Sequence, residues 1–190
     1  MEKRQKSLLR IAGILLMIYC IYSLITTRSM ISIILAGGVL AKNYNTFIIY
    51  SVVNILELIS IGFIAVVLLK GRYNKLLGIT FGIFALLSLA SLVINMSLLN
   101  FINFLIPALL FVGIVFEKQV SNLKKPIALL CTYLSVAVVL ITVINLANMA
   151  EPERWGRYPF IGPYGYLNFF RLFIFQAIMS FSFICVSAVL

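Results

Sequence analysis

The sequence predicts an all-α fold: a polytopic integral membrane bundle of six transmembrane helices, with the N-terminus and the C-terminus in the cytoplasm. The 190-residue chain is 63% apolar and has a mean hydropathy of +1.14, which no ordinary soluble domain has. Several apolar runs reach the roughly 20 residues that a helix needs to cross a bilayer, and they are continuous, unlike the alternating strands of a membrane β-barrel. The Lys and Arg residues that give the net charge of +10 lie in short loops, as topology signals do.

The predicted spans form a single transmembrane domain over residues 1–190, and they cover residues 8–26, 46–69, 76–94, 101–116, 126–148 and 168–190. The basic segment 1–7 precedes the first span, which lacks a small-residue cleavage site and is therefore interpreted as a retained signal-anchor. After it, residues 30–41 are apolar, but twelve residues are too few to cross, and Gly37 and Gly38 weaken a helix there. A short re-entrant or interfacial segment is expected at 30–41.

The later spans carry local signals of packing and bending. In the third span, Gly78 and Gly82 are four residues apart, a spacing that lets another helix approach closely within the bundle. In the fourth, Pro107 removes the donor for the carbonyl of Asn103, so a kink is expected. Pro126 opens the fifth span, where proline is well tolerated.

Loop charges predict the orientation. With the N-terminus inside, the cytoplasmic side receives ten basic residues and the outer side five. This excess favours a cytoplasmic N-terminus and, after six spans, a cytoplasmic C-terminus. We expect a multi-pass protein of the cell membrane, with the lipid bilayer as its first partner.

Glu57 is the acidic residue on which a functional hypothesis can be built, because no other Asp or Glu lies inside an apolar run. An ionisable group at membrane depth is costly and by default indicates a site. On a helix, Thr46, Tyr50, Asn54 and Glu57 fall within one narrow arc, so this span should have a polar face turned away from lipid.

Other spans have polar faces as well, and helical rise brings several polar side chains to similar depths in the outer half of the bundle. Glu57 is expected about 16 Å deep and Ser88 about 10 Å deep, counted from the outer ends of their own spans. If the faces converge, they form an outward-facing polar pocket beneath the aromatic loop 149–167. The predicted ligand-binding residues are Tyr50, Asn54, Glu57, Ser88, Thr142, Trp155, Gln176 and Ser180.

Each of these assignments has an alternative. The Ser and Thr side chains can simply hydrogen-bond between helices, at about 0.6 kcal/mol each. Glu57 can be a protonated structural carboxyl group. The loop 149–167, with Trp155, can be an aromatic belt on the outer leaflet rather than a lid or a docking surface.

Several kinds of chemistry lack their residues. The chain has no His and no Asp, so a Ser-His-Asp triad, a His-based metal site and a paired intramembrane carboxylate are not expected. We expect no enzyme activity, no cofactor, no metal and no nucleic acid partner. Cys20, Cys131 and Cys185 lie far apart within apolar runs and are expected to be buried small residues without a disulfide.

Two hypotheses from different classes remain. The first is a component that binds or transports a small solute. The size and the six-span layout resemble those of the substrate-binding subunits of energy-coupling-factor vitamin transporters; the resemblance covers layout, and the small-xxx-small pattern of their first helix is absent from residues 8–26. The second is a non-transporting accessory, immunity or regulatory protein that binds another membrane protein or a transporter subunit.

Overall fold

The computed structural model describes residues 3–35, 44–71, 73–94, 96–149 and 163–190, and within these ranges every regular element is helical. These elements are α1 (Lys3–Leu35), α2 (Tyr44–Leu69), α3 (Lys75–Ile94), α4 (Leu98–Val115), the short 3-10 helix η2 (Ser121–Leu123), α5 (Lys124–Met149) and α7 (Pro163–Ser187). The predicted all-α membrane bundle is confirmed.

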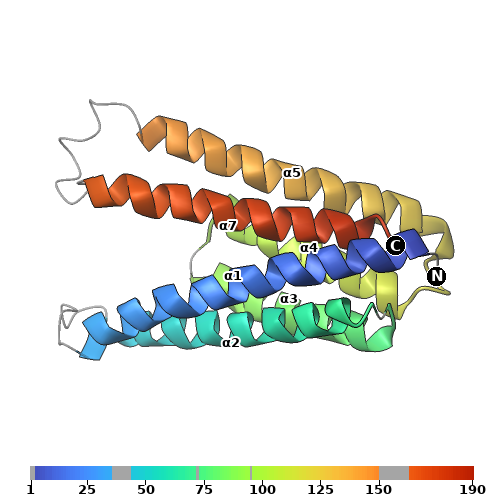
Figure 1. The fold of residues 1–190 in the computed structure, drawn as a ribbon, viewed down its shortest axis with the longest axis horizontal. Coiled ribbons are helices and arrows are strands. Elements are labelled where there is room, and N and C mark those ends of the chain that lie inside the picture. Colours follow the sequence, from blue (N-terminus) through green and yellow to red (C-terminus); the bar gives the residue numbers. More distant parts are fainter. Residues whose placement is uncertain (1–2, 36–43, 72, 95, 150–162) are drawn as a thin grey trace.

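The six long helices run up and down and pack as a closed ring. Each contacts the next along the chain, and α7 returns to contact α1 (Figure 1). The N- and C-termini lie at the same end, which we call the terminal end; it also holds the α2–α3 and α4–α5 connections. The opposite end, with the α3–α4 connection, is called the distal end. An even number of passes places both termini on one side, as the sequence predicts.

Local signals explain where the helices begin and end. α2 ends at Leu69, two residues before Gly71, whose φ of 61° is the left-handed conformation that glycine adopts after helix C-termini. α3 begins after Asn74, whose Oδ1 accepts the backbone N–H of Leu77 at 3.2 Å. α4 begins after Ser97, whose Oγ accepts the backbone N–H of Asn100 at 3.1 Å. These caps satisfy backbone groups that the helix ends would otherwise leave unpaired.

The predicted boundaries agree with the helices to within three residues, except at the start of α1, which begins at Lys3 and not at residue 8, and at the distal end. The expectation of a separate segment from residue 30 was wrong in its described part, because residues 30–35 continue α1, a helix of 33 residues. Residues 36–41 of that segment lie outside the described residues. The predicted loop 149–167 was also too long, because α7 begins at Pro163, where proline suits the first helical position.

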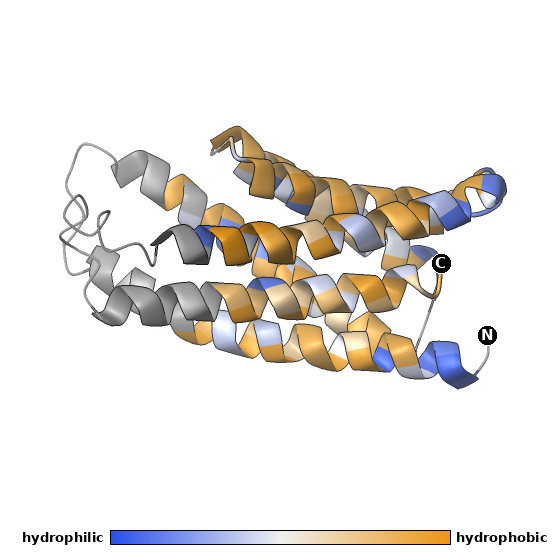
Figure 2. Ribbon diagram, turned by 90° about the horizontal axis from the view of Figure 1, so that it is seen from above, coloured by the Kyte–Doolittle hydropathy of each residue, from blue (hydrophilic) through white to orange (hydrophobic). Residues whose placement is uncertain are grey.

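The helices are apolar on all sides, as membrane helices are. Five of them contain stretches in the described residues long and apolar enough to cross a membrane, and α7 contributes a further apolar stretch over Phe173–Ser187. Large apolar side chains point outward along the bundle, with Ile18 half exposed and Phe63 62% exposed. In water such a surface would aggregate, but lipid covers it. Figure 2 shows the hydrophilic segments gathered toward the terminal end.

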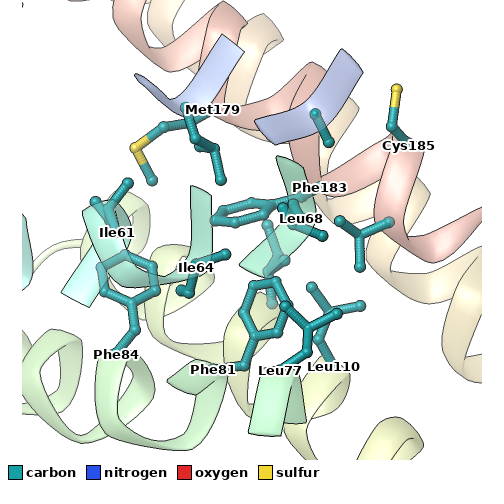
Figure 3. Packing of buried hydrophobic residues seen from close by; sticks show 14 of the residues in the cluster. Ile61, Ile64, Leu68, Leu77, Phe81, Phe84, Leu110, Met179, Phe183 and Cys185 are labelled. Atoms are coloured by element: carbon teal, nitrogen blue, oxygen red, sulfur yellow. The ribbon is translucent and has the colours of Figure 1, made fainter. Parts of the chain in front are cut away.

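The interior toward the terminal end is filled by one hydrophobic cluster (Figure 3). The rings of Phe81 and Phe84 on α3 both face Phe183 on α7, at centroid distances of 6.1 and 6.4 Å. Leu68 and Leu110 are fully buried and bring α2 and α4 into the same cluster. The three cysteines are free and buried, as expected, and Cys131 donates to the carbonyl of Ile106 across α4 and α5.

Glycines mark the closest helix contacts. A Cβ on Gly78 would lie 2.6 Å from Val115, and one on Gly82 would lie 2.8 Å from the Phe111 ring, so the predicted glycine pair packs α3 against α4. The tightest backbone approach lies elsewhere. A Cβ on Gly13 of α1 would lie 2.8 Å from the backbone nitrogen of Leu69 and 3.0 Å from the carbonyl oxygen of Ala65 on α2.

Candidate functional site

A polar cavity of about 250 Å³ lies inside the ring, on the distal side of the hydrophobic cluster. Five helices, α1, α2, α3, α4 and α7, contribute side chains that carry polar atoms, and aromatic and aliphatic groups complete the wall. The described lining residues are Tyr19, Asn54, Glu57, Ile61, Phe84, Ser88, Ser91, Asn100, Asn103, Gln176 and Met179. In an apolar bundle, such a concentration of amide, hydroxyl and carboxyl groups indicates a binding site.

Glu57 projects from α2 into this cavity and meets α3. The Ser91 hydroxyl donates a hydrogen bond of 2.8 Å to its Oε1, and Ser88 is a second hydrogen-bonding neighbour one turn away. Both serines are buried, whereas Glu57 is partly accessible. Among the described residues that line the cavity, none carries a positive charge. The carboxylate is therefore held by hydroxyl donors and has no basic counterpart there.

The first two turns of α4 supply two amides. The Ser97 cap fixes the start of the helix, which places Asn100 in the first turn and Asn103 three residues later on the same face. Pro107 has no N–H, so it cannot donate to the carbonyl of Asn103. The start of the helix that the Ser97 cap fixes thus brings two amide side chains to the same wall.

α7 and α1 close the remaining side. The Oε1 atom of Gln176 is buried and has no hydrogen-bond partner among the described residues. Tyr19 is positioned by aromatic packing, since its ring meets Phe175 edge-on at 5.7 Å. Phe175 also contacts Tyr22 at 4.3 Å, which holds α1 against α7 at this level.

The floor of the cavity is apolar. Ile61, Phe84 and Met179 line it and are also members of the hydrophobic cluster, with 3%, 3% and 7% of their surface exposed. Figure 3 shows Phe183 and Phe81 next to these residues in the same cluster. The cavity is therefore closed toward the terminal end.

Four of the eight predicted ligand-binding residues line this cavity: Asn54, Glu57, Ser88 and Gln176. Thr142 and Ser180 are buried but are not among the described lining residues, and the Thr142 hydroxyl donates instead to the carbonyl of Val138 in its own helix. The side chain of Tyr50 and the whole of Trp155 lie outside the described residues, so their predicted roles stay predictions.

Sequence reasoning missed four of the polar lining residues. Asn100 was assigned to a loop because the fourth span was predicted to begin at residue 101, three residues after the actual start of α4 at Leu98, and Asn103 was considered only for its carbonyl. The pair Asn100 and Asn103, three residues apart in an apolar run, was the available signal. Ser91 belonged to a recognised polar face and was left out of the site. Tyr19 carries no sequence signal that separates it from the neighbouring aromatic residues.

The site is closer to the end of the ring than Glu57's position in its own span implies. Ser91 lies in the last turn of α3, and Asn100 lies in the first turn of α4. α2 has 26 residues and extends beyond the 20-residue α3 at the distal end. Depths counted from each helix end therefore have no common origin, so the depth predicted for Glu57 on α2 is not comparable with that predicted for Ser88 on α3.

A buried tyrosine lies at the opposite end of the bundle. The Tyr73 hydroxyl, in the α2–α3 connection, is buried and has no hydrogen-bond partner among the described residues. Burial raises the pKa of this phenol above its ordinary value, and the carboxylate of Glu117 raises the pKa further. Glu117 itself pairs with Lys124. This group is far from the cavity and packs the connection against the helices.

The Ser91 hydrogen bond gives a first testable prediction. Ser91→Ala should lower the free energy of unfolding by about 1–2 kcal/mol, above the ~0.6 kcal/mol average for interhelical bonds, because the partner is a carboxylate. Ser182→Ala is the matched control: its buried hydroxyl donates to Ile178 in the same helix, and the loss should stay within about 0.5 kcal/mol. Thermal unfolding in detergent measures both, and equal effects would contradict the interhelical bond.

Comparisons with protein-family models, with curated proteins and with solved structures found no match for this chain.

Proposed function

We propose that this chain is a small-solute binding or transport component of the cell membrane, with the solute held in the polar cavity around Glu57. The observation that carries the proposal is a cavity of about 250 Å³ whose described lining includes a carboxylate without a basic partner and four amide side chains. Cavities for drug-sized ligands begin near 300 Å³, so the ligand is smaller than that.

The location of the cavity supports binding from one side of the membrane. The lining reaches the last turn of α3 and the first turn of α4 at the distal end, while the hydrophobic cluster closes the other side. The cavity is thus closed toward the terminal end, which is the arrangement expected of a component that binds its solute from the other side. Six spans without a second half fit a binding component that works beside a partner subunit.

The basic residues support an orientation with the cavity facing outward. The described Lys and Arg residues in the connections and at the N-terminus are at the terminal end: Lys3, Arg4, Lys6, Arg10, Lys70, Lys75, Lys118, Lys124 and Lys125. Short loops rich in Lys and Arg stay in the cytoplasm. On this basis we propose that the terminal end is cytoplasmic.

Cysteine labelling tests the orientation. In a chain without its native cysteines, Asn74→Cys and Ser121→Cys should be protected from an impermeant thiol reagent in intact cells. Met96→Cys should be labelled, because Met96 lies in the α3–α4 connection and is 88% exposed. Permeabilised cells serve as the control and should label all three. Labelling at Asn74 with protection at Met96 would reverse the orientation.

Native mass spectrometry of the purified protein tests solute binding. We expect a co-purifying small molecule in the wild type and in Ser182→Ala, and its loss in Glu57→Leu. Absence of any small molecule from the wild type, together with capture of a single membrane protein, would favour the second hypothesis.

That second candidate, an accessory protein, has one specific observation in its favour. Two apolar grooves flank the outward face of α2, one of about 740 Å³ against α1 and one of about 420 Å³ against α3. Both include Ile59 and Phe63, which are half exposed or more. In this alternative, a helix of another membrane protein packs over the ridge that Ile59 and Phe63 form between the two grooves. A crosslinker placed at position 63 would then join the chain to that partner.

A further inference from the structure

We infer that the ligand of the cavity is a small organic ammonium ion. This inference rests on the proposed solute-binding function and specifies its ligand class. The observation behind it is an excess of electron-rich groups: the described lining combines one carboxylate, several amide oxygens and two aromatic rings with no basic side chain.

The carboxylate provides the charge. Glu57 is partly buried between α2 and α3, and its hydrogen-bonding neighbours there are the hydroxyls of Ser91 and Ser88. A carboxylate removed from water needs a counter-charge or a proton, because hydroxyl donors alone replace only part of its hydration. The ion pair found among the described residues is Glu117 with Lys124, at the other end of the bundle. A cationic ligand would supply the positive charge that the described lining of the cavity lacks.

A further acceptor points to a ligand with several N–H donors. The Oε1 atom of Gln176 is buried without a partner among the described residues, a loss that usually costs about 1–3 kcal/mol. Asn103 adds an amide side chain to the same lining. A primary ammonium group has three N–H donors, so it can serve the carboxylate and the Gln176 oxygen together.

The rings and the volume favour an organic cation over a bare metal ion. Tyr19 and Phe84 lie in the wall, and aromatic faces attract organic cations as well as packing against their carbon atoms. A bare cation takes its oxygen ligands at about 2–2.6 Å and needs a much smaller cage than 250 Å³. Ile61 and Met179 at the floor suit the aliphatic part of an organic ligand.

Matched probes test the ligand class with the full-length protein in detergent. Propylammonium, propionamide and propionate have nearly the same shape and carry positive, no and negative charge. Methylammonium and phenethylammonium vary the size of the cation, and sodium and potassium chloride represent the inorganic cations. Binding is followed by calorimetry and by the ligand-induced shift of the thermal midpoint. We expect at least one ammonium ion to bind and both propionamide and propionate to bind at least tenfold more weakly.

Glu57→Gln keeps the shape and the hydrogen-bonding capacity of the side chain and removes the charge. It should weaken ammonium binding by about 30-fold or more, as loss of one member of a desolvated charge pair does. Asn103→Leu should weaken binding by about tenfold, and Ser182→Ala, away from the cavity, should leave it unchanged. Thermal unfolding of each unliganded variant shows whether it is folded.

Each other outcome overturns the inference. Propionamide or propionate binding as well as propylammonium would show a solute site of different specificity. Sodium or potassium binding through Glu57, without competition from any ammonium ion, would assign an inorganic cation. If none of the ammonium ions binds, the ligand class is wrong. Native mass spectrometry tests the proposed function independently, because a co-purified neutral or anionic molecule would preserve the solute site and exclude the ammonium ion.

Discussion

Glu57→Leu is expected to abolish solute binding and to leave the protein as thermally stable as the wild type or more so. The leucine removes the carboxylate on which the ligand depends, so affinity should fall by about 30-fold or more. It also removes a partly desolvated charge without a basic neighbour in the described cavity wall. Replacing such groups by apolar side chains is often neutral or stabilising. Ligand titration and thermal unfolding in detergent measure the two effects.

Glu57→Gln separates titration from hydrogen bonding. Among the described lining residues, Glu57 and Tyr19 are the ionisable ones, so Tyr19→Phe is the control. If Glu57 binds a cation or carries a proton, Glu57→Gln should preserve folding and remove the pH dependence of binding, while Tyr19→Phe should retain it. A structural role alone predicts that Glu57→Gln preserves both stability and binding. Wild-type behaviour of both the Leu and the Gln variants would show that Glu57 is neither a site nor an important bond.

Gly13→Leu is expected to have the largest effect on stability. A Cβ at this position would lie 2.8 Å from the backbone nitrogen of Leu69 and 3.0 Å from the carbonyl oxygen of Ala65. Helix backbones cannot move aside as side chains can, so α1 and α2 must separate along this contact. Overpacking costs about 1–3 kcal/mol and more where backbone must shift, so we expect a loss of at least about 3 kcal/mol. Loss of the folded fraction on size-exclusion chromatography and a lower thermal midpoint would show it.

Gly62→Ala is the matched control on the same pair of helices. A Cβ there would meet Cys20 Sγ at 3.9 Å, an ordinary contact, and alanine favours helix over glycine. We expect this variant to be neutral or slightly stabilised. Equal tolerance of Gly13→Leu and Gly62→Ala would mean that the α1–α2 contact is looser than the structure shows.

The architecture was largely predictable because apolar length and loop charge report it directly. The described helices begin and end within a few residues of the predicted spans, apart from the continuation of α1 to Leu35 and the early start of α7. The continuation of α1 was missed because the polar residues 26–29 interrupt the apolar pattern, although they remain helical. The early start of α7 was missed because hydropathy detects where a helix is apolar rather than where it begins. The site was less predictable, because helical spacing gives the face of each residue but not which helices are neighbours.

The ring order decided which polar faces met. α2, α3, α4 and α7 bring Glu57, Ser91, Asn103 and Gln176 to one cavity, whereas the Thr142 hydroxyl on α5 bonds within its own helix. The sequence pattern of a single helix does not reveal that α1 contacts α7, and it does not reveal that α2 extends further than α3. A depth estimate measured from the terminal end, where the short connections align the helices, would have placed Glu57 and Ser88 at one level.

The apolar floor of the cavity has an electrical consequence. Under the proposed function, a cation that reaches Glu57 has crossed only the part of the membrane potential that falls on the distal side of the cavity floor, and the rest falls across the layer that holds Phe81, Phe84 and Phe183. At about 2.3 kcal/mol per charge for about 100 mV, each tenth of the potential that the cation crosses changes its affinity by about 0.2 kcal/mol. That layer of phenylalanines would insulate the site from the terminal end while the site exchanges its ligand.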